Sequence, residues 1–399
     1  MSVDVRHRPT PADRKARIAV AALFLTNGAL FANLVPRLPQ IKADLALDNA
    51  AYGMVVAAFP AGAIVVGLTA ATLIRRFGSA PLAVTSTLLT GTALWAAVTV
   101  PSALALAVLL FLAGAVDSVT DVAQNAHGLR VQRRYGRSII NSFHALWSVG
   151  AVTGGSMAAA AIALDLPLGV HMGIVAALCG LVALIALRFC LPGRDDAPDD
   201  SGRTLAPEPK RGPVGVRTAL LLTALVLIAI GGTVVEDAGS SWATLYLSTE
   251  LGAPAALAAT GFIALVGAQF VGRLLGDRLV DRFGQRTVAR AGGLLVAAGM
   301  GLALAFPTVP GTILGFAASG LGVATLVPAA MHEADEIPGL RTGTGLTLVS
   351  WLMRLGFLLS PPLVGLVADA AGLRVGLLVV PLAGVLVIGL SGVLQARRR

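Results

Sequence analysis

Three polar side chains recur within one apolar stretch at a spacing that suits chemistry. Asp117, Asp121 and Asn125 stand four residues apart in the run 103–129, so on a helix they line one face. An ionised carboxylate at the centre of a spanning helix costs ~2.5–3.5 kcal/mol on insertion scales and usually faces a cavity or a partner. Apolar surroundings favour the neutral acid, which suits a proton carrier. The stripe predicts either a proton-carrying site or carboxylates that brace a neighbouring helix.

A histidine in the next apolar run lies at the depth of this stripe. His144 is about two helical turns from the polar connection 130–137, and Asp121 is about two turns from the same connection on the preceding antiparallel helix. We therefore expect a hydrogen bond or ion pair between His144 and Asp121. An unperturbed imidazole titrates at about pH 6.5, so such a pair can exchange protons. The alternative is a packed histidine that hydrogen-bonds a neighbouring helix.

The second half of the chain has charged groups of its own in apolar runs. Arg354 is the basic residue well inside a run, and it needs water or an anion. Glu236 and Asp237 are the acids available in that half, although helix rise places them nearer the outer leaflet. Arg354 is either one partner of a buried structural ion pair or an anchor for an anionic substrate. Glu236 and Asp237 are further candidates for proton coupling.

Two tryptophans and an asparagine complete the candidate binding groups. Trp147 and Trp351 lie well inside their runs at comparable depths, whereas tryptophan usually lies at the membrane interface. They are interpreted either as walls on which a substrate stacks or as plain helix packing. Asn27 lies in the middle of the first run and is expected to hydrogen-bond in a cavity. The candidate substrate-binding residues are Asn27, Asn125, Trp147, Trp351 and Arg354.

Twelve apolar runs must position these groups. The chain is 56% hydrophobic and 13% charged, with a mean hydropathy of +0.82. A bilayer core is ~30 Å thick and a helix rises ~1.5 Å per residue, so each run can cross once. The runs are continuous rather than alternating, which predicts helices and not barrel strands. The predicted spans are 17–37, 50–74, 80–100, 103–129, 138–163, 168–191, 216–247, 254–277, 287–306, 309–332, 342–369 and 373–395.

Basic residues gather on one side of this arrangement. Of the 30 Lys and Arg residues, 26 fall on the side of both termini, three fall on the other side, and Arg354 lies within a span. The positive-inside rule then places both termini in the cytoplasm. The high pI of about 10.6 is thus explained by membrane orientation and not by a nucleic-acid partner. A proline-rich, acidic stretch, 192–215, is predicted as a flexible linker between two six-helix bundles, 1–191 and 216–399.

The two halves repeat each other. A shift of 206 residues places the Arg-Phe-Gly triplet that ends at Gly78 on the one that ends at Gly284, and Gly150 on Gly356. Parallel repeats of this kind are a known transporter plan, with a substrate site at the midplane between the halves. The sequence therefore predicts an all-α membrane protein of two pseudo-symmetric six-helix bundles.

The connection after the second span of each half resembles the signature loop of the major facilitator superfamily. The second half matches at the acidic, basic and glycine positions, whereas the first half has Arg75 at the acidic position. In that family the acid is thought to bridge to neighbouring helix ends, so the resemblance implies a working latch in the second half alone. The residues of this conformational latch are Asp281, Arg282, Gly284, Arg286, Arg76 and Gly78.

A longer run carries a narrower resemblance. The segment Asp121-Val-Ala-Gln-Asn125-Ala-His127-Gly128, followed by Ser142-Phe-His-Ala-Leu-Trp-Ser, resembles a bacterial subgroup allied to the fucose permeases. The resemblance implies secondary transport in the bacterial cytoplasmic (inner) membrane. It names no substrate.

No nucleotide-binding loop, metal cluster or nucleophile triad appears in the sequence, so we expect no enzyme activity, no metal and no cofactor. We expect a monomeric multi-pass transporter whose partners are the lipid bilayer, a small-molecule substrate and protons, working by alternating access as a symporter or an antiporter. One alternative is a drug or metabolite exporter of the same fold, since Gly150-Ala-x-x-Gly154-Gly155 resembles an antiporter signature with Ala151 in place of its proline. Another is a non-transporting membrane sensor.

Overall fold

The structure is a computed structural model, and it describes residues 9–136, 139–193, 215–337 and 344–395. The start of the predicted fifth span and most of the predicted linker 192–215 lie outside the described residues. So do several of the basic residues that were counted for orientation, among them Arg137 and Arg341.

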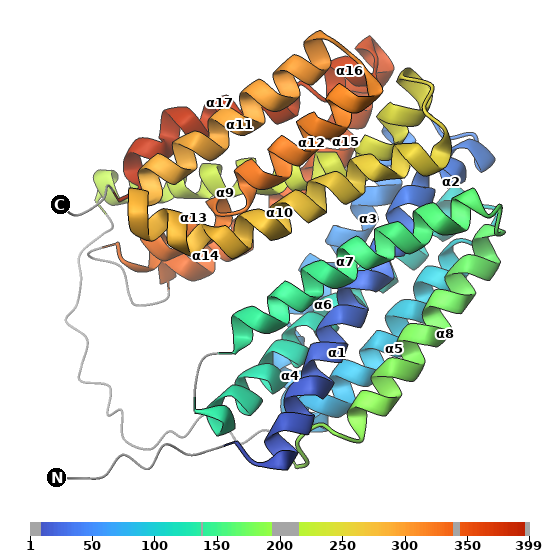
Figure 1. Cartoon of the computed structure of the whole chain (residues 1–399), viewed down its shortest axis with the longest axis vertical. Helices are drawn as coiled ribbons and strands as arrows, with labels where there is room; N and C mark the ends of the chain where they lie inside the picture. The colour runs from blue at the N-terminus through green and yellow to red at the C-terminus, as the bar shows by residue number, and fades with distance from the viewer. Residues whose placement is uncertain (1–8, 137–138, 194–214, 338–343, 396–399) are drawn as a thin grey trace. The chain divides into compact units, whose positions relative to one another are not determined.

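The described ranges form α-helices joined by short connections, and they contain no β-strand. The helices, labelled in Figure 1, are α1 (Pro11–Leu34), α2 (Leu38–Asp44), α3 (Asn49–Gly67), α4 (Ala70–Phe77), α5 (Ser79–Ala97), α6 (Ala103–Tyr135), α7 (Ile140–Ala163), α8 (Leu168–Leu187), α9 (Val216–Leu245), α10 (Ala255–Phe283), α11 (Gln285–Ala305), α12 (Val309–Val323), α13 (Leu326–Asp335), α14 (Thr344–Leu352), α15 (Arg354–Ala371), α16 (Leu373–Gly376) and α17 (Val379–Leu390).

Within the described residues, twelve helical stretches are long and apolar enough to cross a membrane, which confirms the predicted number of spans. The second stretch ends at Gly67, earlier than predicted, and the separate helix α4 follows it. The first stretch begins at Pro11, earlier than predicted, because Thr10 and Asp13 form a capping box that starts the helix. The fourth continues to Tyr135, where Gly136 ends it in the left-handed conformation at φ 65°. Local capping residues thus define helix ends that lie beyond the apolar runs.

The chain forms two compact units. The first unit comprises Met1–Arg37 and Ala58–Asp200, and the second comprises Leu38–Ala57 and Ser201–Arg399. In the first unit, α1 packs against α6, α7 and α8, and α5 packs against α6 and α8. In the second unit, α9 packs against α10, α13, α15 and α17, and α11 packs against α12 and α17 (Figure 1).

The predicted repeat is present in the backbone. Gly78 and Gly284, which are 206 residues apart, have φ 82° with ψ 152° and φ 82° with ψ 153°, respectively. Each ends one helix and begins the next, and a residue with a Cβ rarely adopts this positive φ. The two signature loops therefore make the same turn.

Two close helix crossings repeat as well. A Cβ on Gly114 would lie 1.9 Å from the carbonyl oxygen of Phe59, and a Cβ on Gly320 would lie 2.0 Å from that of Leu265. Both glycines and both carbonyls are related by the shift of 206 residues. Glycine permits this close backbone approach, so the repeat extends to the way the second and fourth spans of each half pack.

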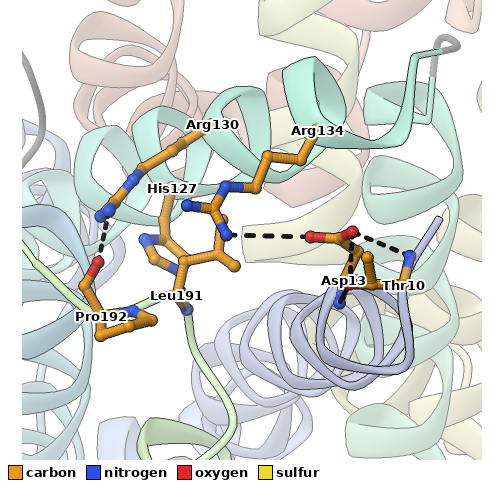
Figure 2. A network of polar contacts seen from close by, with 7 residues as sticks. All are labelled: Thr10, Asp13, His127, Arg130, Arg134, Leu191 and Pro192. Atoms are coloured by element: carbon orange, nitrogen blue, oxygen red, sulfur yellow. Dashed lines mark hydrogen bonds and ion pairs between the residues drawn. The ribbon is translucent and has the colours of Figure 1, made fainter. Parts of the chain in front are cut away.

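A polar cluster ties the segment that follows α8 to α6 (Figure 2). The backbone N–H of Leu191 donates to His127 Nε2 at 3.2 Å. His127 Nδ1 lies 2.9 Å from Ser79 Oγ. Arg130 donates to the carbonyl oxygen of Pro192. Since Nε2 accepts, Nδ1 carries the proton and donates to the serine, so His127 is a neutral, doubly hydrogen-bonded residue.

The start of α1 lies beside the same end of α6 (Figure 2). Thr10 donates to the Asp13 carboxylate from both its backbone N–H, at 2.9 Å, and its hydroxyl, at 2.6 Å. Arg134 of α6 lies 3.9 Å from the other Asp13 oxygen, with 54% of the arginine side chain exposed. An exposed ion pair of this length contributes little, so the capping box is the main anchor of the helix start.

The second unit contains the counterpart of the α8 anchor. The backbone N–H of Gln395 donates to Glu333 Oε1 at 2.6 Å, and its side-chain amide donates to Glu336 Oε2 at 2.6 Å. Glu333 and Glu336 stand 206 residues after His127 and Arg130. In both units, the same two positions of the fourth span hold the chain as it leaves the last span.

Candidate functional site

The side chain of Asn27 joins three helices in the first unit. Asn27 Nδ2, on α1, donates to Asp117 Oδ1 of α6 at 2.7 Å. Asn27 Oδ1 accepts from Trp147 Nε1 of α7 at 2.9 Å and from Gln124 Nε2 of α6 at 3.3 Å. Asn27 is 7% exposed and Gln124 is fully buried. We call these four residues the Asn27 cluster.

Glycines bring the helices close enough for this cluster to form. A Cβ on Gly28 would lie 2.1 Å from the carbonyl oxygen of Trp147, and a Cβ on Gly150 would lie 2.1 Å from that of Leu25. Both contacts lie between α1 and α7 and involve backbone, which cannot rotate away. The short Asn27 side chain can therefore reach the Trp147 indole across the crossing.

A second group of polar side chains lies further along α6. Asn125 Nδ2 donates to Asp121 Oδ1 at 3.0 Å and to the Asp121 carbonyl oxygen at 2.8 Å. Asn125 Oδ1 lies 3.1 Å from His144 Nε2 of α7. Because the asparagine oxygen accepts, His144 Nε2 donates. The predicted Asp121–His144 partners are thus joined through Asn125, and we call these three residues the Asn125 cluster.

The two clusters differ in their surroundings. His144 is exposed and its ring stands edge-on to Phe24 at 5.2 Å between centroids, whereas the Asn27 cluster is largely buried. Asp117 and Asp121 lie about one turn apart on α6. Among the described residues, no group of three or more His, Cys, Asp or Glu side chains could hold a metal ion. The arrangement can hold and exchange protons and can donate hydrogen bonds.

The candidate acids of the second unit are on α9. Glu236 Oε2 accepts from Gln269 Nε2 of α10 at 2.7 Å and lies 3.8 Å from Arg273 Nη2. Asp237 Oδ1 accepts from Ser241 Oγ at 3.3 Å. Glu236 is therefore one partner of an ion pair, whereas Asp117 and Asp121 of the first unit accept hydrogen bonds from Asn27 and Asn125.

The basic partner of Glu236 is Arg273 and not Arg354. Arg354 is the first residue of α15 and is half-buried, and within the described part of the chain it makes no hydrogen bond or ion pair. Trp351 lies near the end of α14 with 47% of its surface exposed. Within the second unit, Arg354 and Trp351 thus take no part in the pairing of Glu236 with Arg273.

Three residues of these groups were not among the sequence candidates. Gln124 follows Asp117 by seven residues and so belongs to the same helix face. Gln269 and Arg273 are four residues apart in the predicted eighth span, with the spacing of neighbours on a helix. Helical spacing from Asp117 could have identified Gln124, although a neutral amide gives a weaker hydropathy signal than a charge. Gln269 and Arg273 lie on α10 and Glu236 lies on α9, so spacing within one helix could not have paired them.

The latch residues share their local geometry in the two units. Arg76 and Arg282 each stack over the phenylalanine that follows, at 5.3 Å from the ring centroid. Arg286 donates to the carbonyl oxygens of Leu394, at 3.0 Å, and Gly392, at 2.7 Å. Asp281 is exposed, and no contact of its carboxylate is found among the described residues. Arg286 therefore fastens the chain that leaves the last span.

Comparisons with known proteins agree with this arrangement. Residues 20–279 and 238–398 match the sequence profile of the Major Facilitator Superfamily. The chain is 30% identical over 382 residues to the uncharacterized transporter y4wD of Sinorhizobium fredii, an alignment that covers 94% of this chain and 97% of that protein.

Two solved structures show the fold. The nucleoside transporter NupG has a TM-score of 0.73 and 13% identity, covering 96% of this chain and 99% of that chain. The fucose:proton symporter FucP has a TM-score of 0.59 and 19% identity, covering 94% of this chain and 97% of that chain. At these identities the likeness is one of fold.

Proposed function

The chain belongs to the Major Facilitator Superfamily, and we propose that it is a proton-coupled secondary transporter. It moves a small molecule across the bacterial cytoplasmic membrane by alternating access between two six-helix bundles, 1–191 and 216–399, joined by a cytoplasmic linker. Both termini lie in the cytoplasm, and the transporter works as a monomer.

The main support for this proposal is that groups able to exchange protons lie close together in the spans of the first unit. Asp117 and Asp121 lie on one face of α6, and their carboxylate oxygens accept hydrogen bonds from Asn27 and Asn125. A carboxylate in this setting is costly when charged and tolerated when neutral. Its protonation can therefore bias which side of the transporter opens.

Substrate binding is proposed at the polar and aromatic groups beside these acids. Asn125 and Trp147 carry hydrogen-bonding and stacking groups, and Arg354 of the second unit is the candidate for an acidic group on the substrate. FucP is described as a fucose:proton symporter, so proton coupling is a property of that protein. For this chain it rests on Asp117, Asp121 and their neighbours.

An exporter of the same fold is the second candidate, because Gly154 and Gly155 lie in the segment that resembles an antiporter signature. A non-transporting sensor is disfavoured by the retained polar clusters, since a sensor would tolerate their loss. Symport and antiport are distinguished by the direction in which a proton gradient drives the substrate.

The test begins with a ligand-stabilisation screen on the purified protein, covering sugars, organic acids and cationic drugs. The compound that stabilises the protein most is then used in proteoliposomes. Asp121→Asn should abolish accumulation driven by a pH gradient and leave counterflow exchange largely intact, because exchange needs no proton cycle.

Two outcomes contradict this assignment. If Asp121→Asn retains full pH-driven transport, then Asp121 is not the carrier, and Glu236 or Asp237 takes its place. If accumulation and counterflow are both lost, Asp121 has a structural or substrate-binding role. Asn33→Ala is the matched control, because Asn33 is a buried asparagine of α1 that bonds His171, at 3.0 Å, and not the acids.

A further inference from the structure

We infer that Asn27 is a positioning residue that links the charge on Asp117 to the placement of the Trp147 indole. This inference rests on the proposed function, in which Asp117 exchanges a proton. It starts from the Asn27 cluster, where the Asn27 amide hydrogen-bonds both the Asp117 carboxylate on α6 and the Trp147 indole on α7.

The orientation of the Asn27 amide follows from its partners. An indole N–H can only donate a hydrogen bond, and the Gln124 amide nitrogen can only donate. Asn27 Oδ1 must therefore face Trp147, at 2.9 Å, and Gln124, at 3.3 Å. The amide nitrogen is left to face Asp117. Reversing the amide would set donor against donor at Trp147, so the chemistry of the neighbours defines this arrangement.

This orientation assigns different roles to the two oxygens of Asp117. Oδ1 accepts the Asn27 N–H at 2.7 Å, which it can do whether the acid is charged or neutral. A proton taken up by Asp117 therefore resides on Oδ2. Uptake leaves the hydrogen bond in place but weakens it, because a bond to a carboxylate is shorter and roughly twice as strong as a neutral one.

The weakening reaches Trp147 through a single rigid group. The Asn27 amide is planar, so a movement of its nitrogen relative to Asp117 also moves its oxygen relative to Trp147 Nε1. Chains of hydrogen bonds also polarise one another in surroundings of low dielectric. By linkage, a substrate that stacks on Trp147 and displaces the indole changes the proton affinity of Asp117 in return.

The Asn125 cluster provides an internal comparison. It lies on the same helix as Asp117 and also pairs an acid with an asparagine, but it ends on His144 and not on Trp147. Removing the Asn125 hydrogen bonds should leave the link between Asp117 and Trp147 unchanged. Asn125→Ala is therefore the matched control for Asn27→Ala.

Other titratable and charged groups around the cluster must be separated from Asp117. On α5 there are none, and α4 has its arginines near the end. The groups on the elements packed around α1, α6 and α7 are Asp121, His127 and Tyr135 on α6, His144 on α7, Asp13, Arg14, Lys15 and Arg17 on α1, Arg37 on the 3₁₀ turn Val35–Arg37, Arg75 and Arg76 on α4, Arg130, Arg133 and Arg134 at the end of α6, and His171, Cys179, Arg188 and Cys190 at α8. Of these, His144 lies closest along the chain to Trp147, so it is replaced by glutamine in the test protein.

The experiment needs no substrate. Three of the four tryptophans, Trp95, Trp242 and Trp351, are replaced by phenylalanine in a His144→Gln background, so that Trp147 is the remaining emitter. Its emission wavelength is followed from about pH 5 to about pH 9 in lipid nanodiscs, a range that spans the values of shifted carboxyl groups. We expect a sigmoidal shift of several nanometres that is absent in Asp117→Asn, absent in Asn27→Ala and retained in Asn125→Ala.

Distinct results separate this inference from the proposed function. A shift that is lost in Asp117→Asn but retained in Asn27→Ala overturns the role of Asn27 and leaves proton coupling through Asp117 standing. A test protein without any shift also overturns it. Failure of the proposed function appears elsewhere, as full pH-driven accumulation in proteoliposomes of the acid variants.

A second measurement covers the case in which Asn27→Ala does not fold. Infrared difference spectra identify the carboxyl band of Asp117 by its loss in Asp117→Asn. Trp147→Phe removes the indole donor and leaves Asn27 in place, so the titration midpoint of this band should move. An unchanged midpoint in a folded Trp147→Phe protein overturns the inference.

Discussion

The fourth span of each half offers the clearest comparison in this molecule. In the first unit it is α6, which carries Asp117, Asp121 and Asn125 along one face. In the second unit it consists of α12 and α13, and the residues 206 positions later are Val323, Val327 and Met331. The polar stripe of one half is therefore apolar in the other, although both spans have the same place in the repeat.

The backbone contacts of the two spans are nevertheless repeated. Gly114 and Gly320 admit the same close crossing, and His127 and Glu333 receive the same kind of backbone N–H. The candidate proton-coupling acids of the second unit are instead on α9, where Glu236 is paired with Arg273. The repeat thus preserves the scaffold, while the two halves differ in their chemistry.

The largest effect should come from removing the acid on each side of this comparison. Asp117→Asn and Asp121→Asn are each expected to lower pH-driven accumulation in proteoliposomes by an order of magnitude or more, because each removes a carboxyl group that exchanges a proton. Glu236→Gln should lower it much less, because the charge of Glu236 is balanced by Arg273 at 3.8 Å. Counterflow exchange serves as the control for intact binding. A greater loss in Glu236→Gln would transfer the proton step to the second unit.

A large effect on stability should follow from filling the helix crossings. Gly150→Ala would place its Cβ 2.1 Å from the backbone oxygen of Leu25, and overpacking of this kind costs about 1–3 kcal/mol or more. In Gly356→Ala the nearest atom, at 2.0 Å, is the Thr233 hydroxyl, which can be removed. Thermal unfolding in detergent should show a greater loss for Gly150→Ala. Thr233→Ala should partly restore Gly356→Ala, and no restoration would show that the backbone limits both crossings.

The helix-end anchors should give an intermediate effect. His127→Ala leaves the Leu191 N–H and the Ser79 hydroxyl without this partner, and an unsatisfied buried group costs about 1–3 kcal/mol. Glu333→Gln keeps an oxygen that can accept the Gln395 N–H, so it should cost less than about 1 kcal/mol. Thermal unfolding of the two variants and of Glu333→Ala measures the difference. Equal losses for His127→Ala and Glu333→Gln would argue against equivalent anchors.

The smallest effect should come from the signature loops. Asp281 is expected to make a charge-assisted contact that favours the outward-open state, so Asp281→Asn should shift the inward/outward population toward inward-open. Surface charge contacts contribute about 0–1 kcal/mol, so the shift is modest. Accessibility labelling of introduced cysteines, after replacement of the free Cys179 and Cys190, measures it. Arg75→Gln is the control and should have no effect. An unchanged population in Asp281→Asn would remove the asymmetry between the loops.

Much of the fold could be predicted from the sequence, because bilayer thickness imposes a length on every apolar run. All twelve spans were predicted, and the Arg-Phe-Gly triplets indicated the repeat. Helix ends were less accurate, since α1 starts and α6 ends at capping residues, Asp13 and Gly136, that lie beyond the apolar runs. Hydropathy contains no information about these caps.

The candidate site was only partly predictable. Spacing placed Asp117 and Asp121 on one face, and equal depth brought His144 near Asp121. The partners across helices depend on how each helix is rotated about its axis, which spacing within one helix does not determine. The contacts of Asn27 with Trp147 and Asp117 were therefore not predicted from the sequence. The sequence also suggested Arg354 as the basic partner of Glu236, whereas the structure pairs Glu236 with Arg273.

The anchoring of each half at its end has a consequence for the order in which the protein is made. The α6 helix is synthesised before α8, so His127 Nε2 has no Leu191 N–H to accept from until the segment after α8 has been made. Glu333 likewise accepts from the backbone N–H of Gln395, which is synthesised after it. A buried acceptor without its donor is costly. When only four or five spans of a half have been inserted, this acceptor still lacks its hydrogen bond. Each bundle is closed by the residues that emerge last, and the polar end of the sixth span supplies the final hydrogen bond.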